Sequence, residues 1–376
     1  VEFGASFNGV SFGRVRTSVG FDFAPLTRRT FGVDDPPSLD LFRTGTGLPN
    51  AAPVVGPVVL SEILYRPADA EGEAVEFIEL QNNTEAAVAL YDANFPTNRW
   101  KLGGGVAFTF PPGVSLAPDA CLLVVDFDPA DAAALAAFRA TYGLSPDVPI
   151  YGPFSGKLAN EGDRVDLYRP DRPQQPPSAD AGFVPYVLAD RVNYAPGFPW
   201  PEISADNAGA SLQRLLPVLY GNDPLNWGAA PPTPGSPNQL PAPDTDGDGI
   251  PDAVEFLWGL ALDDPADGCE DWDGDGSANA DEYRAGTDPL DPGDFLKLDR
   301  IRLESNVELT FRAVANQSYS VLYSESLVNP VWVKLADVAA APVSRVESVK
   351  DLEGRRGPRF YRLVTPAILP GVELVR

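Results

Sequence analysis

Two acidic loops in the second half of the chain have the residue types and spacing to bind a metal ion. The first is DTDGDGIPDAVE at 244–255, and the second is DWDGDGSANADE at 271–282. A calcium loop needs oxygen ligands at positions 1, 3, 5, 7, 9 and 12, with a glycine at position 6 for the sharp turn. Both loops fill every one of these positions, with Gly249 and Gly276 at the turn.

The candidate ligands are carboxylate, amide and carbonyl oxygens. In the first loop they are Asp244, Asp246, Asp248, the carbonyl of Ile250, Asp252 and Glu255. In the second they are Asp271, Asp273, Asp275, the carbonyl of Ser277, Asn279 and Glu282. Hard oxygen ligands without His or Cys favour Ca²⁺ over transition metals, and a bidentate Glu at position 12 disfavours the smaller Mg²⁺. We expect two Ca²⁺ sites.

The stretch around these loops carries most of the charge of the protein. Residues 244–294 hold fourteen Asp, three Glu and one Arg, a net charge of −16 out of −25 for the chain. Without cations the carboxylates should repel each other and keep the segment extended. With Ca²⁺ the loops should fold, because the free energy of metal binding becomes free energy of folding. The alternative is an acidic linker that remains solvated.

Each loop is followed by a predicted short helix, at 253–260 and 280–285, and then by a tetrapeptide, DPAD at 264–267 or DPLD at 288–291. The four aspartates of the tetrapeptides could cap helices, coordinate an ion of the neighbouring loop, or lie in solvated turns. No helix is predicted before Asp244, because the preceding residues 238–243, NQLPAP, are typical of a linker. This departure from a helix-loop-helix favours a structural clip over a switch that opens a groove.

The tandem DxDxDG motif resembles the thrombospondin type 3 and dockerin-like calcium repeats. Residues 273–292, DGDGSANADEYRAGTDPLDP, are especially similar to the bacterial thrombospondin-type form. The resemblance implies calcium binding in an extracellular or cell-surface protein.

The rest of the sequence predicts the β-structure that must position these loops. Forty Pro and thirty-four Gly separate short apolar runs rich in Val, Phe and Tyr, a pattern typical of β-sandwiches. We expect a mainly β chain, with two immunoglobulin-like sandwiches joined by the calcium-binding loop-helix segment. The predicted parts are N-terminal strands and linker at 1–56, a sandwich at 57–240, the calcium repeats at 241–294 and a second sandwich at 295–376.

The part at 57–240 resembles the bacterial lamin-tail-like domain. The motifs that carry the resemblance are, in order, VLSEILYRP at 59–67, EFIEL at 76–80, FTFP at 108–111, YGPFSG at 151–156, SLQR at 211–214, NW at 226–227 and TPGSPN at 233–238. It implies an immunoglobulin-like sandwich in a multidomain surface or secreted protein, and it brings no catalytic residues. One helix is predicted inside it, at 128–142.

The C-terminal part offers five strand candidates and loosely resembles a fibronectin type III sandwich. The candidates are FLKLDRIRL at 295–303, VELTFRAV at 307–314, SYSVLYSES at 318–326, VWVKLA at 331–336 and RFYRLVTP at 359–366. The aromatic residues expected in its core are Phe311, Tyr319, Tyr323, Trp332, Phe360 and Tyr361.

The N-terminal strands are predicted at 1–3 and 10–15. Together they parallel a later strand and loop, because GVSFGR at 9–14 is similar to GASLQR at 209–214. One interpretation is a repeat unit whose first strands lie outside this chain, and the other is chance similarity. In the first case these strands could pair with the sheet edge of another copy and build an open filament or layer.

Composition excludes several classes of function. A net charge of −25 disfavours nucleic acid and anionic membranes as partners, and no apolar run is long enough for a membrane span. The chain has no His, the commonest general base, so we predict no enzyme and no catalytic residue. Cys121 and Cys269 could form a disulfide or remain two thiols.

We therefore expect a non-catalytic, calcium-stabilised extracellular or cell-surface structural protein. The alternative is an adhesion module for carbohydrate or another surface protein, forming the C-terminal part of a larger secreted enzyme. Its ligand platforms would be exposed tryptophans, of which the candidates are Trp200, Trp227, Trp258 and Trp272.

Overall fold

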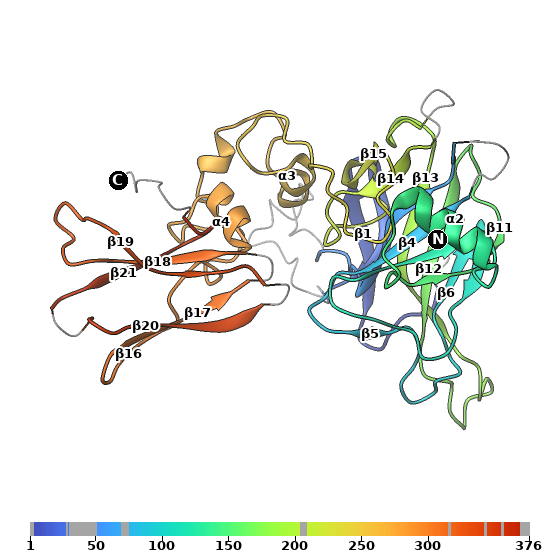
Figure 1. Cartoon of the computed structure of the whole chain (residues 1–376), viewed down its shortest axis with the longest axis horizontal. Coiled ribbons are helices and arrows are strands. Elements are labelled where there is room, and N and C mark those ends of the chain that lie inside the picture. Colours follow the sequence, from blue (N-terminus) through green and yellow to red (C-terminus); the bar gives the residue numbers. More distant parts are fainter. Residues whose placement is uncertain are drawn as a thin grey trace, which may run out of the picture. The chain divides into compact units, whose positions relative to one another are not determined.

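The computed structural model describes residues 4–27, 29, 51–68, 75–203, 209–314, 317–341, 344–354 and 357–368. The chain divides into two compact units, Val1–Ala242 and Pro243–Arg376 (Figure 1). Both are built mainly from antiparallel strands, which confirms the predicted mainly β fold with sandwich architecture. The finer division into four parts remains a prediction.

The first unit contains two large sheets. One has six strands, in the spatial order β10 (Ile150–Tyr151), β9 (Cys121–Val125), β4 (Phe77–Asn82), β3 (Val58–Leu64), β14 (Ser211–Arg214) and β15 (Trp227–Ala230). The other has five, in the order β11 (Ser155–Gly156), β7 (Val106–Thr109), β6 (Lys101–Gly104), β12 (Asp163–Pro170) and β13 (Tyr186–Tyr194). A small extra sheet pairs β5 (Val88–Ala89) with β8 (Ser115–Leu116).

One hydrophobic core lies between the two large sheets. Alternate side chains of each strand face it, such as Ile63 and Leu80 from the six-stranded sheet and Val165, Leu167 and Val192 from the five-stranded sheet. All of these side chains are fully buried. The period-two alternation of apolar residues in the sequence therefore corresponds to one buried face per sheet.

The outer face of the six-stranded sheet is covered by a helix. The helix predicted at 128–142 begins later, as α2 (Ala132–Tyr142), because the carboxylate of Asp131 caps its first turn. Its one buried residue, Phe138, contacts Phe77 edge to face, with ring centroids 6.1 Å apart. This second layer explains why β3 and β4 are buried on both faces.

Two glutamates are buried on the same outer face, directly opposite each other on neighbouring strands. Glu62 of β3 accepts a hydrogen bond from the backbone N–H of Thr233, at 2.9 Å, and Glu79 of β4 accepts one from Gly235, at 2.6 Å. Burial raises the pKa of Glu62 to about 7 and that of Glu79 to about 8, and the neighbouring Glu62 contributes to the second shift. Through these hydrogen bonds the two glutamates hold residues 233–235 against β3 and β4, shortly before the acidic stretch begins.

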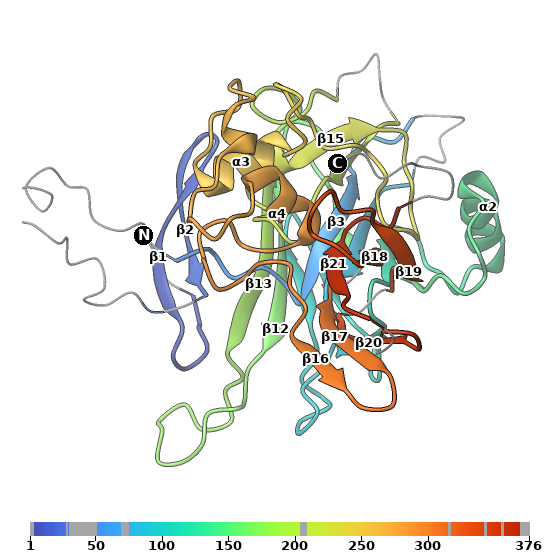
Figure 2. The same cartoon turned by 90° about the vertical axis from the view of Figure 1, so that its left-hand side faces the viewer.

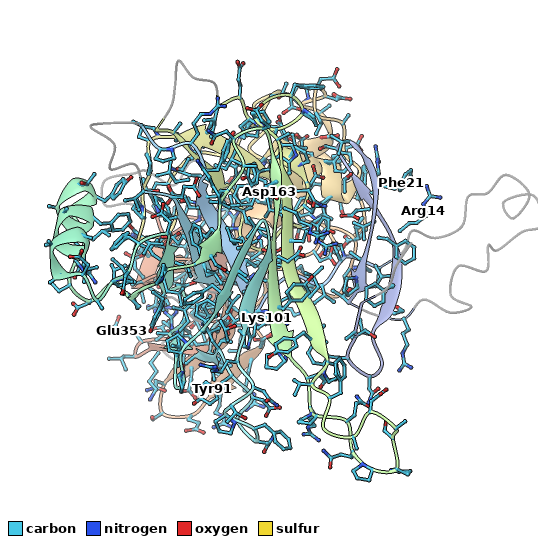
Figure 3. All side chains as sticks on the ribbon, turned by 90° about the vertical axis from the view of Figure 1, so that its right-hand side faces the viewer. Arg14, Phe21, Tyr91, Lys101, Asp163 and Glu353 are labelled. Carbon is cyan, nitrogen blue, oxygen red and sulfur yellow. The ribbon has the colours of Figure 1, made fainter. Side chains whose placement is uncertain are left out.

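The N-terminal strand predicted at 10–15 is β1 (Ser11–Thr17), and it pairs in full register with β2 (Gly20–Leu26) of the same chain. We call these two strands the N-terminal hairpin. The guanidinium of Arg14 lies 4.0 Å from the ring centroid of Phe21 on its exposed side (Figure 3). The strand predicted at 1–3 lies outside the described residues.

The N-terminal hairpin is attached to the rest of the first unit by specific hydrogen bonds. The backbone N–H of Ser18 donates to Asp223, at 2.9 Å, and the hydroxyl of Tyr220 donates to Asp22, at 2.7 Å. Within this unit the hairpin and α2 lie on opposite sides (Figure 2). The N-terminal strands are thus partnered inside their own chain.

The second unit begins with the acidic stretch and ends in a small sandwich. The acidic stretch forms α3 (Asp252–Trp258), a 3₁₀ turn η2 (Asp267–Cys269) and α4 (Asn279–Ala285). One sheet of the sandwich has the order β16 (Arg300–Leu303), β17 (Val307–Ala313) and β20 (Arg345–Asp351). The other has the order β19 (Val333–Val338), β18 (Tyr319–Ser324) and β21 (Phe360–Val364).

Two details of the predicted C-terminal sandwich were wrong. The described residues of this sandwich form six strands rather than five, because β20 was not among the candidates. Of the expected core aromatics, Phe311 and Tyr319 are fully buried, with ring centroids 5.2 Å apart. Tyr361 is partly buried and packs against this core, whereas Tyr323 and Trp332 are only partly buried and Phe360 is exposed.

Candidate metal centre

The first acidic loop is shaped by its own aspartates. The carboxylate of Asp244 accepts hydrogen bonds from the backbone N–H groups of Gly247, at 2.8 Å, and Gly249, at 3.1 Å. Both glycines have positive φ, 79° and 97°, a conformation that a residue with a Cβ rarely adopts. The chain therefore wraps around Asp244, and the next carboxylates turn toward the inside of the loop.

Asp246 and Asp248 each use one oxygen for the loop and leave the other without a partner. Their Oδ1 atoms accept from the backbone N–H groups of Asp248, at 3.1 Å, and Ile250, at 2.7 Å. Their Oδ2 atoms are buried and have no hydrogen-bond partner among the described residues. A buried oxygen without a donor is costly, and a bound cation would satisfy both oxygens at once.

Two further carboxylates complete the first cluster. Glu255 comes from α3 and Asp267 from the turn η2, and both are buried. One oxygen from each of these residues and from Asp246 and Asp248 lies within 4.8 Å of the other three. Both oxygens of Glu255 and Oδ1 of Asp267 lack hydrogen-bond partners in the described part of the chain.

The charges of the first cluster are not neutralised by the described residues, in which no ion pair reaches these four side chains. Burial and the neighbouring carboxylates, first among them Asp246, raise the pKa of Glu255 to about 8. The same causes raise the pKa of Asp248 above its usual value. Four oxygen donors around one point, with unfavourable mutual repulsion, fit a hard divalent cation and no organic group.

The second loop repeats the geometry of the first. Asp271 accepts from the N–H groups of Gly274, at 2.8 Å, and Gly276, at 2.9 Å. Asp273 and Asp275 each accept one backbone hydrogen bond, at 3.1 and 2.7 Å, and keep a buried Oδ2 without a partner. Oxygens of Asp271, Asp273 and Asp275 lie within 4.8 Å of one another.

Glu282 of α4 adds a fourth carboxylate beside this second cluster. Its Oε1 accepts from the hydroxyl of Thr287, at 3.2 Å, and its Oε2 is buried without a partner. Its pKa is raised to about 7, first by burial and then by Asp273 and Asp275. The corresponding residue of the first repeat is Glu255, so both position-12 glutamates are buried at the start of a short helix.

The position-9 side chains, Asp252 and Asn279, accept hydrogen bonds within their own loops, and their role as ligands remains a prediction. Asp252 turns back to Thr245 and accepts from its backbone N–H, at 2.7 Å, and its hydroxyl, at 2.8 Å. Asn279 likewise accepts from the N–H of Trp272, at 3.3 Å. Each of these bonds joins position 9 of a loop to position 2 of the same loop. At position 7, neither the carbonyl of Ile250 nor that of Ser277 accepts a hydrogen bond from a described residue, and both remain candidate ligands.

The two repeats contact each other directly. The amide of Asn279 donates to the backbone carbonyl of Asp267, at 2.8 Å, and the guanidinium of Arg284 to that of Asp248, at 3.4 Å. The rings of Trp258 and Tyr283 also meet edge to face, with centroids 6.2 Å apart. Of the tetrapeptide aspartates, the sequence left Asp267 open between cap, ligand and solvated turn, and the structure places it in the first cluster.

Other sequence candidates lie away from these clusters. Cys121 is buried, Cys269 is exposed, and both are free thiols. Trp200 and Trp227 are buried in the core of the first unit, which contradicts their proposed role as ligand platforms. Of the four tryptophans, Trp272 is the most exposed, at 41%. No helix in the described ranges is both long and apolar enough to cross a membrane.

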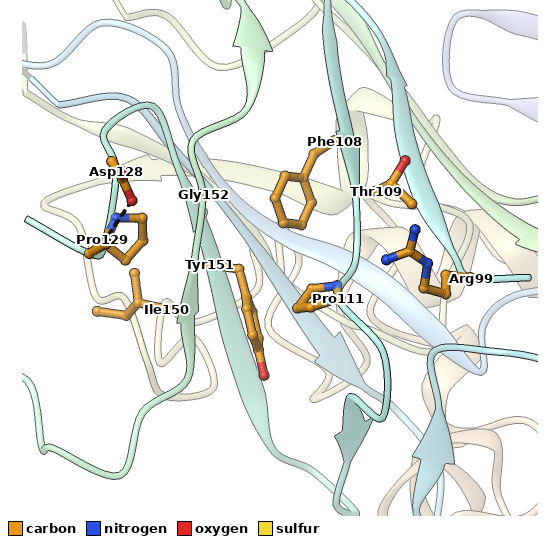
Figure 4. Close-up of a pocket in the computed structure, with 10 residues that line it drawn as sticks. Arg99, Phe108, Thr109, Pro111, Asp128, Pro129, Ile150, Tyr151 and Gly152 are labelled. Carbon is orange, nitrogen blue, oxygen red and sulfur yellow. Dashed lines mark hydrogen bonds between the residues drawn. The ribbon is translucent and has the colours of Figure 1, made fainter. Parts of the chain in front are cut away.

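A shallow pocket, which the sequence did not indicate, opens at one edge of the first unit. It has a volume of about 360 Å³ and lies between β7 and β10. Phe108 and Tyr151 lie in its middle, with Arg99 on one side and Asp128 on the other (Figure 4). The side chain of Arg99 has no hydrogen-bond or ion-pair partner within the described ranges. Aromatic rings beside a cation could contact a sugar or a peptide side chain.

The family model of the bacterial TSP3 repeat matches residues 244–255 and 271–292. This TSP3 repeat is a structural calcium-binding repeat characteristic of extracellular proteins, and no enzyme family matches the chain. No curated protein and no solved structure matches the chain. The TSP3 match covers the second cluster and all of the first except Asp267, and it ends at Pro292, just after the second tetrapeptide.

Proposed function

We propose that this chain is a non-catalytic structural protein of the cell surface or extracellular space, in which two Ca²⁺ ions fold the segment between two β-sandwiches. The observation that carries the proposal is the duplicated loop with its buried, unpartnered carboxylate oxygens. There are five in the first repeat and three in the second. Extracellular calcium is millimolar, so even weak sites of this type would be filled outside the cell.

The function of the ions is mechanical. Without them, the mutual repulsion of the carboxylates opposes closure of the loops. With them, each loop closes around its ion, and the segment changes from a flexible acidic linker to a short rigid clip between the sandwiches. A site at one hundred times its Kd adds about 2.7 kcal/mol of stability to the unit that contains it.

The flanking sandwiches complete the proposal. The first is a lamin-tail-like domain and the second a fibronectin type III-like domain, both serving as structural or interaction modules. Rows of such sandwiches could assemble into a filament or layer. The N-terminal hairpin could take part by pairing with the sheet edge of another copy.

Thermal unfolding and small-angle X-ray scattering test this function. With 2 mM Ca²⁺ we expect a higher Tm of the second unit and a narrower distribution of dimensions than with a chelator. Mg²⁺ at the same concentration serves as the control and should reproduce little of the effect. Unchanged melting and unchanged dimensions after chelation would contradict the proposal.

A binding module for carbohydrate or protein is the second candidate function, and the pocket around Phe108 and Tyr151 favours it. Arg99→Ala removes the unpartnered cation without touching the core, whereas Arg172→Ala alters an exposed cation elsewhere in the unit. A glycan array with both variants would support this function if a glycan bound to wild type and to Arg172→Ala and were lost with Arg99→Ala. If no glycan bound, this second function would be contradicted and only the structural function would remain.

A further inference from the structure

The C-terminal sandwich differs in charge from the rest of the chain. Residues 295–376 carry twelve Lys and Arg against nine Asp and Glu, a net charge of +3 in a protein of net charge −25. Residues 1–56 are neutral, 57–240 carry −12 and 244–294 carry −16. The cations are therefore concentrated in one sandwich, and their arrangement on it decides whether they form a surface.

Strand register places four of these cations on one face of the β16-β17-β20 sheet. Along β17, Leu309 and Phe311 face the core, so the alternate positions, including Arg312, face outward. Residues paired directly across strands share a face. Arg300 and Arg302 pair with outward-facing positions of β17, and Lys350 pairs with Glu308.

This outer face, which we call the basic face, consists of Arg300, Arg302, Glu308, Thr310, Arg312, Val346, Ser348 and Lys350. Its four cations are exposed. Three of them, Arg300, Arg312 and Lys350, have no ion-pair or hydrogen-bond partner in the described part of the chain. The one carboxylate of the face, Glu308, accepts instead from the hydroxyl of Ser348, at 2.9 Å. Arg302 forms an ion pair with Glu304, at 3.5 Å, and the basic face is thus net positive with three unpaired cations among the described residues.

The acidic repeats of the same molecule do not cover the basic face. Within the second unit, α4 lies on the side of the β19-β18-β21 sheet, and the β16-β17-β20 sheet lies on the other side (Figures 1 and 2). The repeats expose carboxylates that belong to neither cluster, namely Asp263, Asp264, Glu270, Asp281, Asp288 and Asp294. Each molecule therefore presents a basic surface and an acidic one in different places.

We propose that the basic face of one molecule docks on the acidic repeats of a second copy. Because the two surfaces differ, the contact is head-to-tail, and each added copy presents a further basic face and a further acidic segment, so the contact can build an open filament or close into a ring. At 0.15 M salt charges interact over about 8 Å, so the complementary surfaces attract although both molecules are acidic overall. At about 1 M salt this distance falls to about 3 Å, and the contact is lost.

The proposal names a partner surface that the calcium function does not require, and the two can fail separately. Sedimentation velocity of the full-length chain in 2 mM Ca²⁺ tests it, over protein concentrations up to about 100 µM. We expect wild type to form concentration-dependent oligomers at 0.15 M NaCl and to be monomeric at 1 M NaCl. Arg300→Glu/Arg312→Glu/Lys350→Glu should weaken association at least tenfold. The calcium-induced rise in Tm of this variant should equal that of wild type, which also shows that it folds.

A matched control is Arg362→Glu, which reverses an exposed cation on the other sheet of the same sandwich and should leave association unchanged. A second approach avoids folding effects, because wild type alone, in 0.15 and 1 M NaCl, reports on the contact. A wild-type chain that stays monomeric in both salts would overturn the proposal. So would association that persists in the triple variant, or a wild type that binds heparin through the basic face without binding itself.

Discussion

The side-chain amide of Asn279 donates a hydrogen bond to the backbone carbonyl of Asp267, at 2.8 Å. Asn279 belongs to the second calcium loop, whereas the carboxylate of Asp267 belongs to the first cluster. Both residues are buried. The position of one carboxylate in the first site is therefore held by a residue of the second, and the two repeats form one structural element rather than two independent loops.

Replacing Asn279 should affect both repeats. Asn279→Ala removes the bond to Asp267 and leaves a buried carbonyl without a donor, at a cost of about 1–3 kcal/mol. We expect the Tm in calcium to fall and calcium affinity to drop at the first site as well as the second, as measured by calorimetric titration. Asp263→Ala, an exposed change in the same segment and outside both clusters, is the control. An effect confined to the second site would show that the bond does not couple the repeats.

Asp267 should act as a ligand of the first ion although it lies outside the twelve-residue loop. Asp267→Asn removes one negative charge and one unpartnered oxygen from the cluster, and we expect the affinity of the first site to fall about tenfold or more, because ligand charge sets the Kd of such sites. Asp264→Asn changes an exposed aspartate of the same tetrapeptide, which caps its own turn through the N–H of Ala266. Equal affinities of the two variants would contradict the assignment.

Both loops could be predicted from the sequence because their ligands are local. Aspartates at alternate positions and glycines at the turns fix the loop whatever surrounds it, and the short helices follow within two residues of their predicted starts. Asp267 could not be assigned in this way. Its contact with the cluster depends on the chain turning back at η2, and Asp-Pro-x-Asp is equally compatible with a solvated turn.

The strand β20 was missed for a related reason. Its inward positions do not carry an apolar alternation, because Arg345 pairs with Glu347 and Asp351 accepts from Arg359 and Tyr361. Polar side chains satisfied by tertiary partners cannot be told from loop residues in the sequence alone.

The strand β6, KLGG, was missed because it offers only Leu102 as an apolar residue. Its Gly104 is required by a φ of 96° and by the backbone carbonyl oxygen of Arg164, which would lie 1.9 Å from an added Cβ.

The buried pair Glu62 and Glu79 should make the first unit less stable as pH rises. Unfolded, both carboxyls lose their protons near pH 4.5, whereas in the folded state they keep them to about pH 7 and 8. Between about pH 4.5 and 8 the folded state therefore binds more protons than the unfolded state. The contribution of the two carboxyls to the free energy of unfolding is fully present below pH 4.5 and is lost as the pH rises to about 8.

Glu62→Gln tests this, because its amide oxygen can still accept from Thr233 but does not titrate. We expect a flatter pH dependence of the free energy of unfolding than in wild type, measured by urea denaturation at several pH values. Glu161→Gln, at an exposed site, should leave the slope unchanged. Equal slopes in all three proteins would rule out the buried pair as the cause.

Arg214 should be essential for the stability of the first unit. Its side chain is fully buried, forms an ion pair with Asp190 at 2.6 Å and donates to the carbonyl of Leu60 at 3.2 Å. Arg214→Ala leaves an unpaired buried carboxylate, so we expect a loss of roughly 3–5 kcal/mol in the free energy of unfolding. Arg14→Ala, at the corresponding position of the similar motif in the N-terminal hairpin, should cost far less because Arg14 is exposed.

The number of calcium ions bound per chain tests the central claim most directly. Calorimetric titration of the metal-free protein should give two Ca²⁺ per chain, falling to one in Glu255→Gln and one in Glu282→Gln, since each substitution removes the buried position-12 carboxylate from a single cluster. The double variant should bind none with comparable affinity. A wild type without saturable binding at millimolar Ca²⁺, or a double variant that still binds two ions, would contradict the account.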